Sequence, residues 1–167
     1  SKYFDIYKYN FNNEKEKRLT ENQRTISPII TKNGKIFAIT TYDGTSNIVE
    51  SKLDTIVFKP LTSFNNGTQI FSLSFDSENN DMIFDAVEHN TRNIYKINLE
   101  NKNISKTQLD FDSRDPYFHG GYTYYSSDET GIYNLYCNGK SITNVIGGAF
   151  MPHISSTGKL LYSLYDN

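Results

Sequence analysis

Tryptophan, cysteine and long apolar runs are missing or scarce in this sequence. A single cysteine, Cys137, can form neither an intrachain disulfide nor a multi-thiolate zinc site, so the fold cannot depend on either. No apolar stretch approaches the roughly 20 residues that a membrane-spanning helix needs, and we expect no transmembrane segment. An excess of positive charge is missing as well. With 17 Lys and Arg against 19 Asp and Glu, the net charge of -2 argues against nucleic acid as a partner.

The 167 residues suffice for one domain or for part of one, and they leave no room for a second domain. Aromatic residues make up 14% of the chain, which is too many for an intrinsically disordered protein. We therefore expect a folded globular chain.

Short apolar runs alternate with polar residues along the chain, as in 36–39 and 122–125. A period near two places successive side chains on opposite faces of a β-strand. Between the runs lie dipeptides that favour the positive φ of tight hairpin turns. They are Asn33-Gly34, Asp43-Gly44, Asn66-Gly67, Asn79-Asn80, Gly120-Gly121, Asn138-Gly139 and Thr157-Gly158. The pattern predicts an all-β chain built of antiparallel hairpins.

Three short signatures recur in the same cyclic order at intervals of about 42 residues. The first is centred on isoleucine, in Asp5-Ile6-Tyr7, Asn47-Ile48-Val49, Asn93-Ile94-Tyr95 and Gly131-Ile132-Tyr133. The second is a Leu-Thr pair, at Leu19-Thr20 and Leu61-Thr62, with weaker echoes at Gln108-Leu109 and Ile142-Thr143. The third places a proline, Pro28, Pro116 or Pro152, a few residues before a glycine that opens an apolar strand.

A period of 40 to 45 residues with four short strands per unit is typical of a β-propeller blade. We expect the proline segment to form the innermost strand, followed outward by the apolar run, the Ile segment and the segment that ends in Leu-Thr. Three complete four-stranded antiparallel blades are then expected at 21–64, 65–110 and 111–148. Residues 1–20 supply only the outer two strands of a blade, and residues 149–167 supply only the inner two.

The two half blades leave two possibilities open. They join and close a four-bladed ring, or the chain is an arc of a larger propeller. We favour the arc, because four is the lower limit for such rings. An arc leaves open strand edges, which favour association with another chain or with missing parts of the same one.

The order Leu19-Thr20, Pro28, Asn33-Gly34, Asp43-Gly44, Asn47-Ile48 resembles the repeat of the TolB-type propeller family, a WD-like repeat. The resemblance extends over residues 5–167, although the Ser-Pro-Asp-Gly turn of that family is altered here. It implies a periplasmic or cell-envelope protein of bacteria with protein or peptide partners. The resemblance is specific for the fold and much less so for the function, because the same blades serve unrelated tasks.

Motifs that carry catalysis are missing from the chain. It has no Gly-x-Ser-x-Gly nucleophile elbow, no Asp box and no glycine loop that leads into a phosphate-binding helix. The acidic residues at hairpin ends do not form a calcium-binding loop. We therefore expect no enzymatic activity, no cofactor and no metal site. His89 is expected in an exposed turn.

The residues just before the inner-strand prolines, Ser27, Asp115 and Met151, are our candidates for binding. The starts of the inner strands and the loops before them converge on one face of a rigid ring and form a recognition surface, and these residues are expected there. His119 and His153 follow their prolines closely, so we expect both near the central channel. We include both among the binding candidates as polar groups of a wet channel wall rather than as metal ligands, since no third ligand stands in matching register.

These observations favour a non-catalytic propeller scaffold for protein or peptide binding. The alternative is the substrate-gating propeller portion of a multidomain peptidase or carbohydrate-active protein, whose catalytic domain lies elsewhere.

Overall fold

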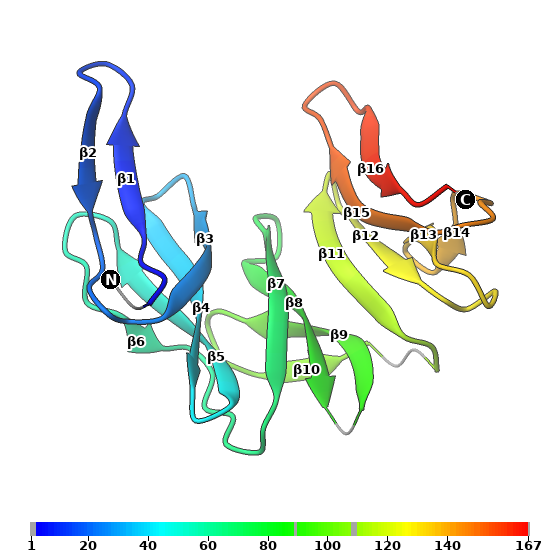
Figure 1. Cartoon of the computed structure of the whole chain (residues 1–167), viewed down its shortest axis with the longest axis horizontal. Coiled ribbons are helices and arrows are strands. Elements are labelled where there is room, and N and C mark those ends of the chain that lie inside the picture. The colour runs from blue at the N-terminus through cyan, green and yellow to red at the C-terminus, as the bar shows by residue number, and fades with distance from the viewer. Residues whose placement is uncertain (1–2, 89, 108–109, 167) are drawn as a thin grey trace. The chain divides into compact units, whose positions relative to one another are not determined.

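The computed structural model of the chain describes residues 3–88, 90–107 and 110–166. His89 and the Gln108-Leu109 echo therefore lie outside the described residues. Those described contain sixteen β-strands and no helix, which confirms the all-β prediction (Figure 1). Accordingly, none of them forms a helix that could cross a membrane. The chain divides into two compact units, residues 1–69 and 70–167.

The first unit contains one two-stranded and one four-stranded antiparallel sheet. The two-stranded sheet consists of β1 (Tyr7–Asn10) and β2 (Lys15–Arg18). The four-stranded sheet consists, in spatial order, of β3 (Thr25–Ile30), β4 (Lys35–Tyr42), β5 (Thr45–Lys52) and β6 (Lys59–Pro60).

The second unit contains two four-stranded sheets and one two-stranded sheet. One four-stranded sheet consists of β7 (Gln69–Asp76), β8 (Asp81–Glu88), β9 (Thr91–Asn98) and β10 (Ile104–Lys106). The other consists of β11 (Ser113–His119), β12 (Tyr122–Ser127), β13 (Asn134–Cys137) and β14 (Lys140–Ser141). The two-stranded sheet consists of β15 (Ala149–Ile154) and β16 (Leu160–Leu164).

Each sheet is a meander in which the strands are hydrogen-bonded in chain order. This is the order expected for propeller blades, with three complete blades and a half blade near each end of the chain. The structure therefore confirms the predicted fold class. Six of the seven predicted dipeptides lie in hairpin turns between paired strands, whereas Asn66-Gly67 lies between β6 and β7, which belong to different sheets. Asp43 and Gly44 both have positive φ between β4 and β5, as do Asn138 and Gly139 between β13 and β14.

A β-bulge interrupts the first strand of three blades at the residue that precedes proline. Ser27, Asp115 and Met151 occupy these bulges, with φ of 51°, 56° and 55°. Proline has no N–H to donate to a ladder, so it is tolerated in edge strands and at bulges. Each of the three residues is the third residue of its strand, near the inner-strand start where it was expected.

A recurring hydrogen-bond unit explains the Leu-Thr signature, and we name it the threonine latch. In each latch the threonine Oγ1 accepts a hydrogen bond from the backbone N–H of a residue in, or just before, the third strand of the blade. The same hydroxyl donates a hydrogen bond to the side-chain oxygen of the Asp or Asn that precedes this residue in the sequence. The pairs are Thr20 with Ile6 and Asp5, Thr62 with Ile48 and Asn47, and Thr143 with Leu135 and Asn134. All six bonds are between 2.8 and 3.0 Å long.

The third complete blade corrects one element of the predicted repeat. Its Ile signature was assigned to Gly131-Ile132-Tyr133, but Ile132 is 37% exposed and precedes the strand. Asn134 and Leu135 occupy the signature positions instead, and Leu135 is fully buried. The sequence comparison was misled because leucine replaces isoleucine at this position.

Apolar side chains of neighbouring sheets pack together within each unit. In the first unit Ile6 packs on Ala38 and Val49, with Leu19 and Phe58 at the margin. In the second unit Ile83 and Ile94 pack on Tyr125 and Tyr136, with Phe118 at the margin. The cores therefore lie between sheets, and each sheet is stabilised by its neighbour rather than alone.

Candidate functional site

A pocket of about 590 Å³ lies in the second unit, between strands of three successive sheets. Phe71 of β7, Arg92 of β9, Arg114 and Asp115 of β11, and Met151 and His153 of β15 contribute to its lining. The two bulges of β11 and β15 bring Asp115 and Met151 to the same place.

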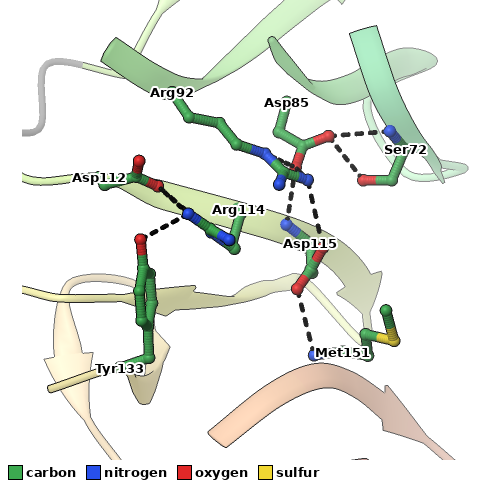
Figure 2. Close-up of polar contacts among 8 residues, drawn as sticks. All are labelled: Ser72, Asp85, Arg92, Asp112, Arg114, Asp115, Tyr133 and Met151. Carbon is green, nitrogen blue, oxygen red and sulfur yellow. Dashed lines mark hydrogen bonds and ion pairs between the residues drawn. The ribbon is translucent and has the colours of Figure 1, made fainter. Parts of the chain in front are cut away.

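A charged cluster of Asp85, Arg92 and Asp115 lies beside this pocket (Figure 2). Asp85 belongs to β8 and is fully buried. Its Oδ1 accepts hydrogen bonds from the backbone N–H and the hydroxyl of Ser72, both 2.8 Å long. Its Oδ2 accepts bonds from Arg92 Nε and from the backbone N–H of Asp115, both 2.9 Å long. The buried carboxylate is therefore paired with a cation and surrounded by donors, which offsets its desolvation.

Asp115 connects this cluster to the next sheet. Its carboxylate accepts two long contacts of 3.4 Å, one from Arg92 Nη2 and one from the backbone N–H of Met151. The bulge frees that N–H from the strand ladder, so it is available to a side chain. Burial raises the pKa of the Asp115 carboxyl, and the negative charge of Asp85 raises it further, against the opposing effect of Arg92.

Arg114 points away from this cluster and toward Asp112 and Tyr133 (Figure 2). Its Nη2 donates to Asp112 Oδ1 at 3.1 Å and to the Tyr133 hydroxyl at 2.5 Å. Burial raises the pKa of Tyr133 to about 12, with a further contribution from Asp112 and an opposing one from Arg114. The phenol therefore stays neutral at physiological pH and acts here as a hydrogen-bonding group.

An aromatic ring lies against each of the two guanidinium groups, Phe71 against Arg92 and Tyr133 against Arg114. The Arg92 guanidinium lies 4.3 Å from the ring centroid of Phe71, a cation–π geometry. Phe71 is 46% exposed and Met151 is 66% exposed. The rings of Tyr117 and His153 contact each other with centroids 4.4 Å apart. The pocket thus combines exposed apolar side chains with charges that are held in place by buried partners.

The Ser72 hydroxyl and the carboxylates beside the pocket are engaged in hydrogen bonds. Among the described residues, the Ser72 hydroxyl donates to the Asp85 carboxylate and shows no bond to a histidine. Within residues 3–88, 90–107 and 110–166, no group of three or more His, Cys, Asp and Glu side chains is arranged to hold a metal ion.

The five predicted site residues separate into two groups. Asp115, Met151 and His153 line the same pocket. His119 ends β11 opposite Tyr122 and is not part of that lining, and Ser27 belongs to the first unit.

Sequence reasoning missed several residues of the site, among them Phe71, Ser72, Asp85, Arg92 and Arg114. A position before the hairpin turn aligns Ser72 with Met151. The side chain of Asp76 caps the turn after β7, four residues beyond Ser72. The side chain of Ser155 caps the turn after β15, four residues beyond Met151. Ser72 therefore corresponds in position to Met151, but it does not share the positive φ of the bulge residues, and no proline follows it. A second signal was available in the sequence, because Asp85 interrupts an otherwise apolar strand.

Solved structures share this fold, although no family model matches the sequence and no curated protein does. TolB from Acinetobacter baumannii superimposes with a TM-score of 0.80 at 20% identity, over 95% of this chain and 42% of that one. This is a TolB-like β-propeller fold. A putative TolB from Agrobacterium tumefaciens superimposes with a TM-score of 0.64 at 12% identity, over 92% of this chain and 75% of that one.

A chain of a nidogen–laminin complex superimposes with a TM-score of 0.64 at 14% identity, over 83% of this chain and 54% of that one. At such identities the likeness concerns the fold alone. The chain spans less than half the length of the Acinetobacter baumannii TolB chain.

Proposed function

We propose that the chain is a non-catalytic β-propeller scaffold and that it binds a protein or peptide at the pocket beside Asp115 and Met151. The observation that carries this proposal is the exposure of Phe71 and Met151 around a rigid charged cluster. Exposed apolar side chains rimmed by fixed polar groups are the usual composition of a protein-binding surface.

The cluster reduces the cost of binding. Arg92 is held by Asp85 and Asp115, so its orientation is set before a partner arrives. An apolar side chain of the partner would lie between Phe71 and Met151, while His153 and Arg114 offer polar contacts at the margin. The presence of a similar fold in a nidogen–laminin complex supports a role in protein–protein recognition.

Peptide selection tests this proposal. A phage-displayed library of random peptides is selected on the intact chain, and the affinity of the selected peptides is measured by calorimetry. Met151→Asn should weaken binding about tenfold, the size expected for the loss of one apolar anchor. Asparagine tolerates the positive φ of this position, so the bulge is retained.

Ile146→Asn is the matched control, because Ile146 is 90% exposed and is not part of the pocket lining. Equal affinities for the two variants would contradict the assigned site. Turnover of any member of a panel of peptidase and glycosidase substrates by the chain alone would contradict the non-catalytic role.

We further propose a periplasmic or cell-envelope location, supported by the TolB-like fold. Cell fractionation with an antibody against the chain tests it, and recovery in the cytoplasmic fraction would overturn it.

Association through open strand edges is a separate proposal. Each half blade contains two strands where the complete blades contain four. Unpaired backbone donors and acceptors at such an edge favour the addition of a strand from another chain.

A further inference from the structure

A second pocket, of about 490 Å³, lies in the first unit, and we call it the basic pocket. Its lining comes from β4, β5, β6 and the loop between β5 and β6 (Figure 1). Among the described residues that line it, one is acidic, Glu50, and three are lysines, Lys35, Lys52 and Lys59. The lining therefore carries an excess of positive charge, although the chain as a whole has a net charge of -2.

Two of these lysines stand directly opposite each other on neighbouring strands. Lys35 of β4 pairs with Lys52 of β5. The adjacent pair, Gly34 and Leu53, is joined by a backbone hydrogen bond of 2.9 Å, so the two lysines form a pair of the non-hydrogen-bonded kind. Side chains lie closest in such pairs, and like charges placed there destabilise a sheet. An anion bound between the two ammonium groups would remove this repulsion.

The acidic residue of the basic pocket offsets only part of its charge. Glu50 forms an ion pair of 3.8 Å with Lys35, whose side chain is 44% exposed. Glu50 also faces Lys59 across the strands. In the described part of the chain neither Lys52 nor Lys59 forms an ion pair. Two of the three ammonium groups are therefore available to a ligand.

The loop between β5 and β6 is held in place by a buried serine. Ser51 Oγ accepts a hydrogen bond of 2.9 Å from the backbone N–H of Val57 and donates one of 3.2 Å to the carbonyl oxygen of Thr55. Ser51 is only 8% exposed, whereas Val57 is 62% exposed and adds an apolar side chain to the lining. The loop is thus positioned before a ligand arrives, which reduces the cost of binding.

The second complete blade contains a pocket at the corresponding place. The two blades align through one backbone bond, which joins Leu53 to Gly34 in the first blade and Leu99 to Asn80 in the second. The residues that match Lys35, Glu50, Lys52 and Lys59 are Asp81, Lys96, Asn98 and Ser105, all in the lining of that pocket. The hollow itself is therefore a feature of the repeat.

The charges of the two pockets differ. In the second blade Asp81 accepts a bond of 2.7 Å from Asn98 Nδ2 and forms an ion pair of 2.7 Å with Lys96. Asp81 is buried, and its charge is compensated within its own blade. In the first blade a lysine replaces this aspartate, and Lys52 stands opposite it. The same positions of the repeat thus leave uncompensated positive charge in the first blade.

We propose that the basic pocket binds an acidic peptide segment whose carboxylate side chains stand at alternate positions. Carboxylates complement ammonium groups in charge and accept their hydrogen bonds. Lys52 and Lys59 are diagonal neighbours on one face of the sheet, where such neighbours are about 7–8 Å apart. Side chains two residues apart on an extended peptide are about 7 Å apart and point to the same face. Two alternate carboxylates therefore fit the opposed lysine pair and Lys59.

This surface is independent of the pocket beside Asp115. No described residue lines both pockets, and the two belong to different units. Their chemistry also differs, because the basic pocket selects negative charge, whereas the pocket beside Asp115 is assigned an apolar anchor. Failure of one assignment therefore leaves the other intact.

A peptide titration followed by NMR tests the proposal. The isotope-labelled intact chain is titrated with the peptide acetyl-Gly-Glu-Ser-Glu-Gly-amide, in which the two carboxylates alternate. The largest changes in backbone amide shift should occur at Lys35, Lys52 and Lys59. Binding should weaken when the salt is raised from about 0.05 M to about 0.5 M, because salt screens exposed charges. Shift changes confined to the pocket beside Asp115, or no shift changes at all, would overturn the proposal.

Two further probes separate a peptide site from a general anion site. The isomeric peptide acetyl-Gly-Glu-Glu-Ser-Gly-amide has the same charge, but its neighbouring carboxylates point to opposite faces of an extended chain. It should bind at least about threefold more weakly, because one carboxylate alone reaches the pocket. Inorganic phosphate should bind more weakly still. Equal affinity for the two peptides, or phosphate binding as tight as that of the alternating peptide, would contradict the proposed ligand.

Charge variants test the assigned residues. Lys52→Gln should weaken binding of the alternating peptide about fivefold, because the opposed pair loses one of its two charges. Lys32→Gln is the matched control, since Lys32 is exposed in the turn before β4, is not part of the lining and carries the same charge.

Glu50→Gln gives a change of opposite sign. It removes negative charge from the lining and should strengthen binding of the alternating peptide about threefold, a gain that a damaged fold would not produce. Equal effects of Lys52→Gln and Lys32→Gln, or weaker binding by Glu50→Gln, would overturn the proposal.

Discussion

The threonine latches and the charged cluster of Asp85, Arg92 and Asp115 are both buried polar networks, yet they differ in recurrence. In the described part of the chain the latch occurs in three blades with nearly the same bond lengths. The charged cluster occurs once there, and it connects three successive sheets beside a pocket. A feature that recurs in each repeat serves the repeat itself, whereas a feature found at one place is a candidate for function.

The second complete blade shows what happens when the latch is missing. Thr107 donates its backbone N–H to Ile94, as Leu61 does to Ile48, so Thr107 occupies the leucine position of the signature. The residue that follows it in sequence is not a threonine. Asn93 corresponds to Asn47, and its buried side-chain amide has no hydrogen-bond partner within the described residues. Within the described residues, the second blade therefore shows no threonine latch.

The largest effect is expected from Asp85→Asn. The substitution leaves Arg92 without its buried carboxylate and weakens the bonds from Ser72 and Asp115. Breaking a buried ion pair by removing one partner costs about 3–5 kcal/mol. Urea unfolding of the variant and of the unmodified chain gives the difference in the free energy of unfolding. A loss below about 1 kcal/mol would show that the cluster does not stabilise this unit.

A smaller effect is expected from Thr62→Val, which keeps the shape of the side chain and removes its hydroxyl. The backbone N–H of Ile48 and the amide oxygen of Asn47 each lose a bond. Such a loss costs about 1–3 kcal/mol in the free energy of unfolding. Thr91→Val serves as the control because Thr91 is exposed. Equal unfolding curves for the two variants would contradict the role of the latch.

Two carboxyl groups should give opposite pH dependence. Burial raises the pKa of Asp115 in the folded chain above its pKa of about 3.9 in the unfolded chain. Ionisation of Asp115 therefore lowers stability as the pH rises from the unfolded pKa to the folded pKa. For Asp5, burial also raises the pKa, but bonds from Arg18 and Thr20 outweigh it and hold the pKa below its usual range. The stability that Asp5 supplies is therefore present above about pH 4 and is lost as the pH falls toward its folded pKa.

Unfolding free energies measured between acid and neutral pH test these signs. We take the free energy of unfolding of the unmodified chain minus that of the variant. This difference should decrease with rising pH for Asp115→Asn and increase with rising pH for Asp5→Asn. The slope for Asp115→Asn is limited to about 1.4 kcal/mol per pH unit, the maximum for one titrating group. Slopes of the same sign for both variants would refute the assignment.

The smallest effect is expected from Asn93→Leu. Since the Asn93 amide has no partner within the described residues, an apolar side chain of similar shape should change the free energy of unfolding by less than about 1 kcal/mol. Asn47→Leu, at the latched position, should cost about 1–3 kcal/mol. Similar losses at the two positions would remove the distinction between latched and unlatched blades.

The repeat was predictable from the sequence because its determinants are local. Pro28, Pro116 and Pro152 mark the innermost strands, and the Thr20 and Thr62 signatures mark the outer ends of their blades. Each depends on bonding within a few residues or between adjacent strands. Turn chemistry and strand periodicity report such bonding directly.

The charged cluster was not predictable in the same way. The cluster forms only because Asp115, which belongs to another sheet, bonds to Asp85 and Arg92. Ser72 takes part through its bonds to Asp85. A contact between sheets leaves no regular spacing in the sequence. Two of the predicted residues, Asp115 and Met151, were found for a local reason, since both precede a proline. That they line one pocket follows from the packing of β11 and β15.

The most direct test of the account measures peptide affinity and unfolding free energy together for Met151→Asn and Thr62→Val. We expect Met151→Asn to weaken binding about tenfold while the free energy of unfolding changes by less than about 0.5 kcal/mol. Thr62→Val should lower the free energy of unfolding by about 1–3 kcal/mol and leave the affinity of the folded chain unchanged. The account would be contradicted if peptide affinity and the free energy of unfolding fell together in either variant, or if Met151→Asn bound peptide normally. The latches and the binding site would then not be separate features of the fold.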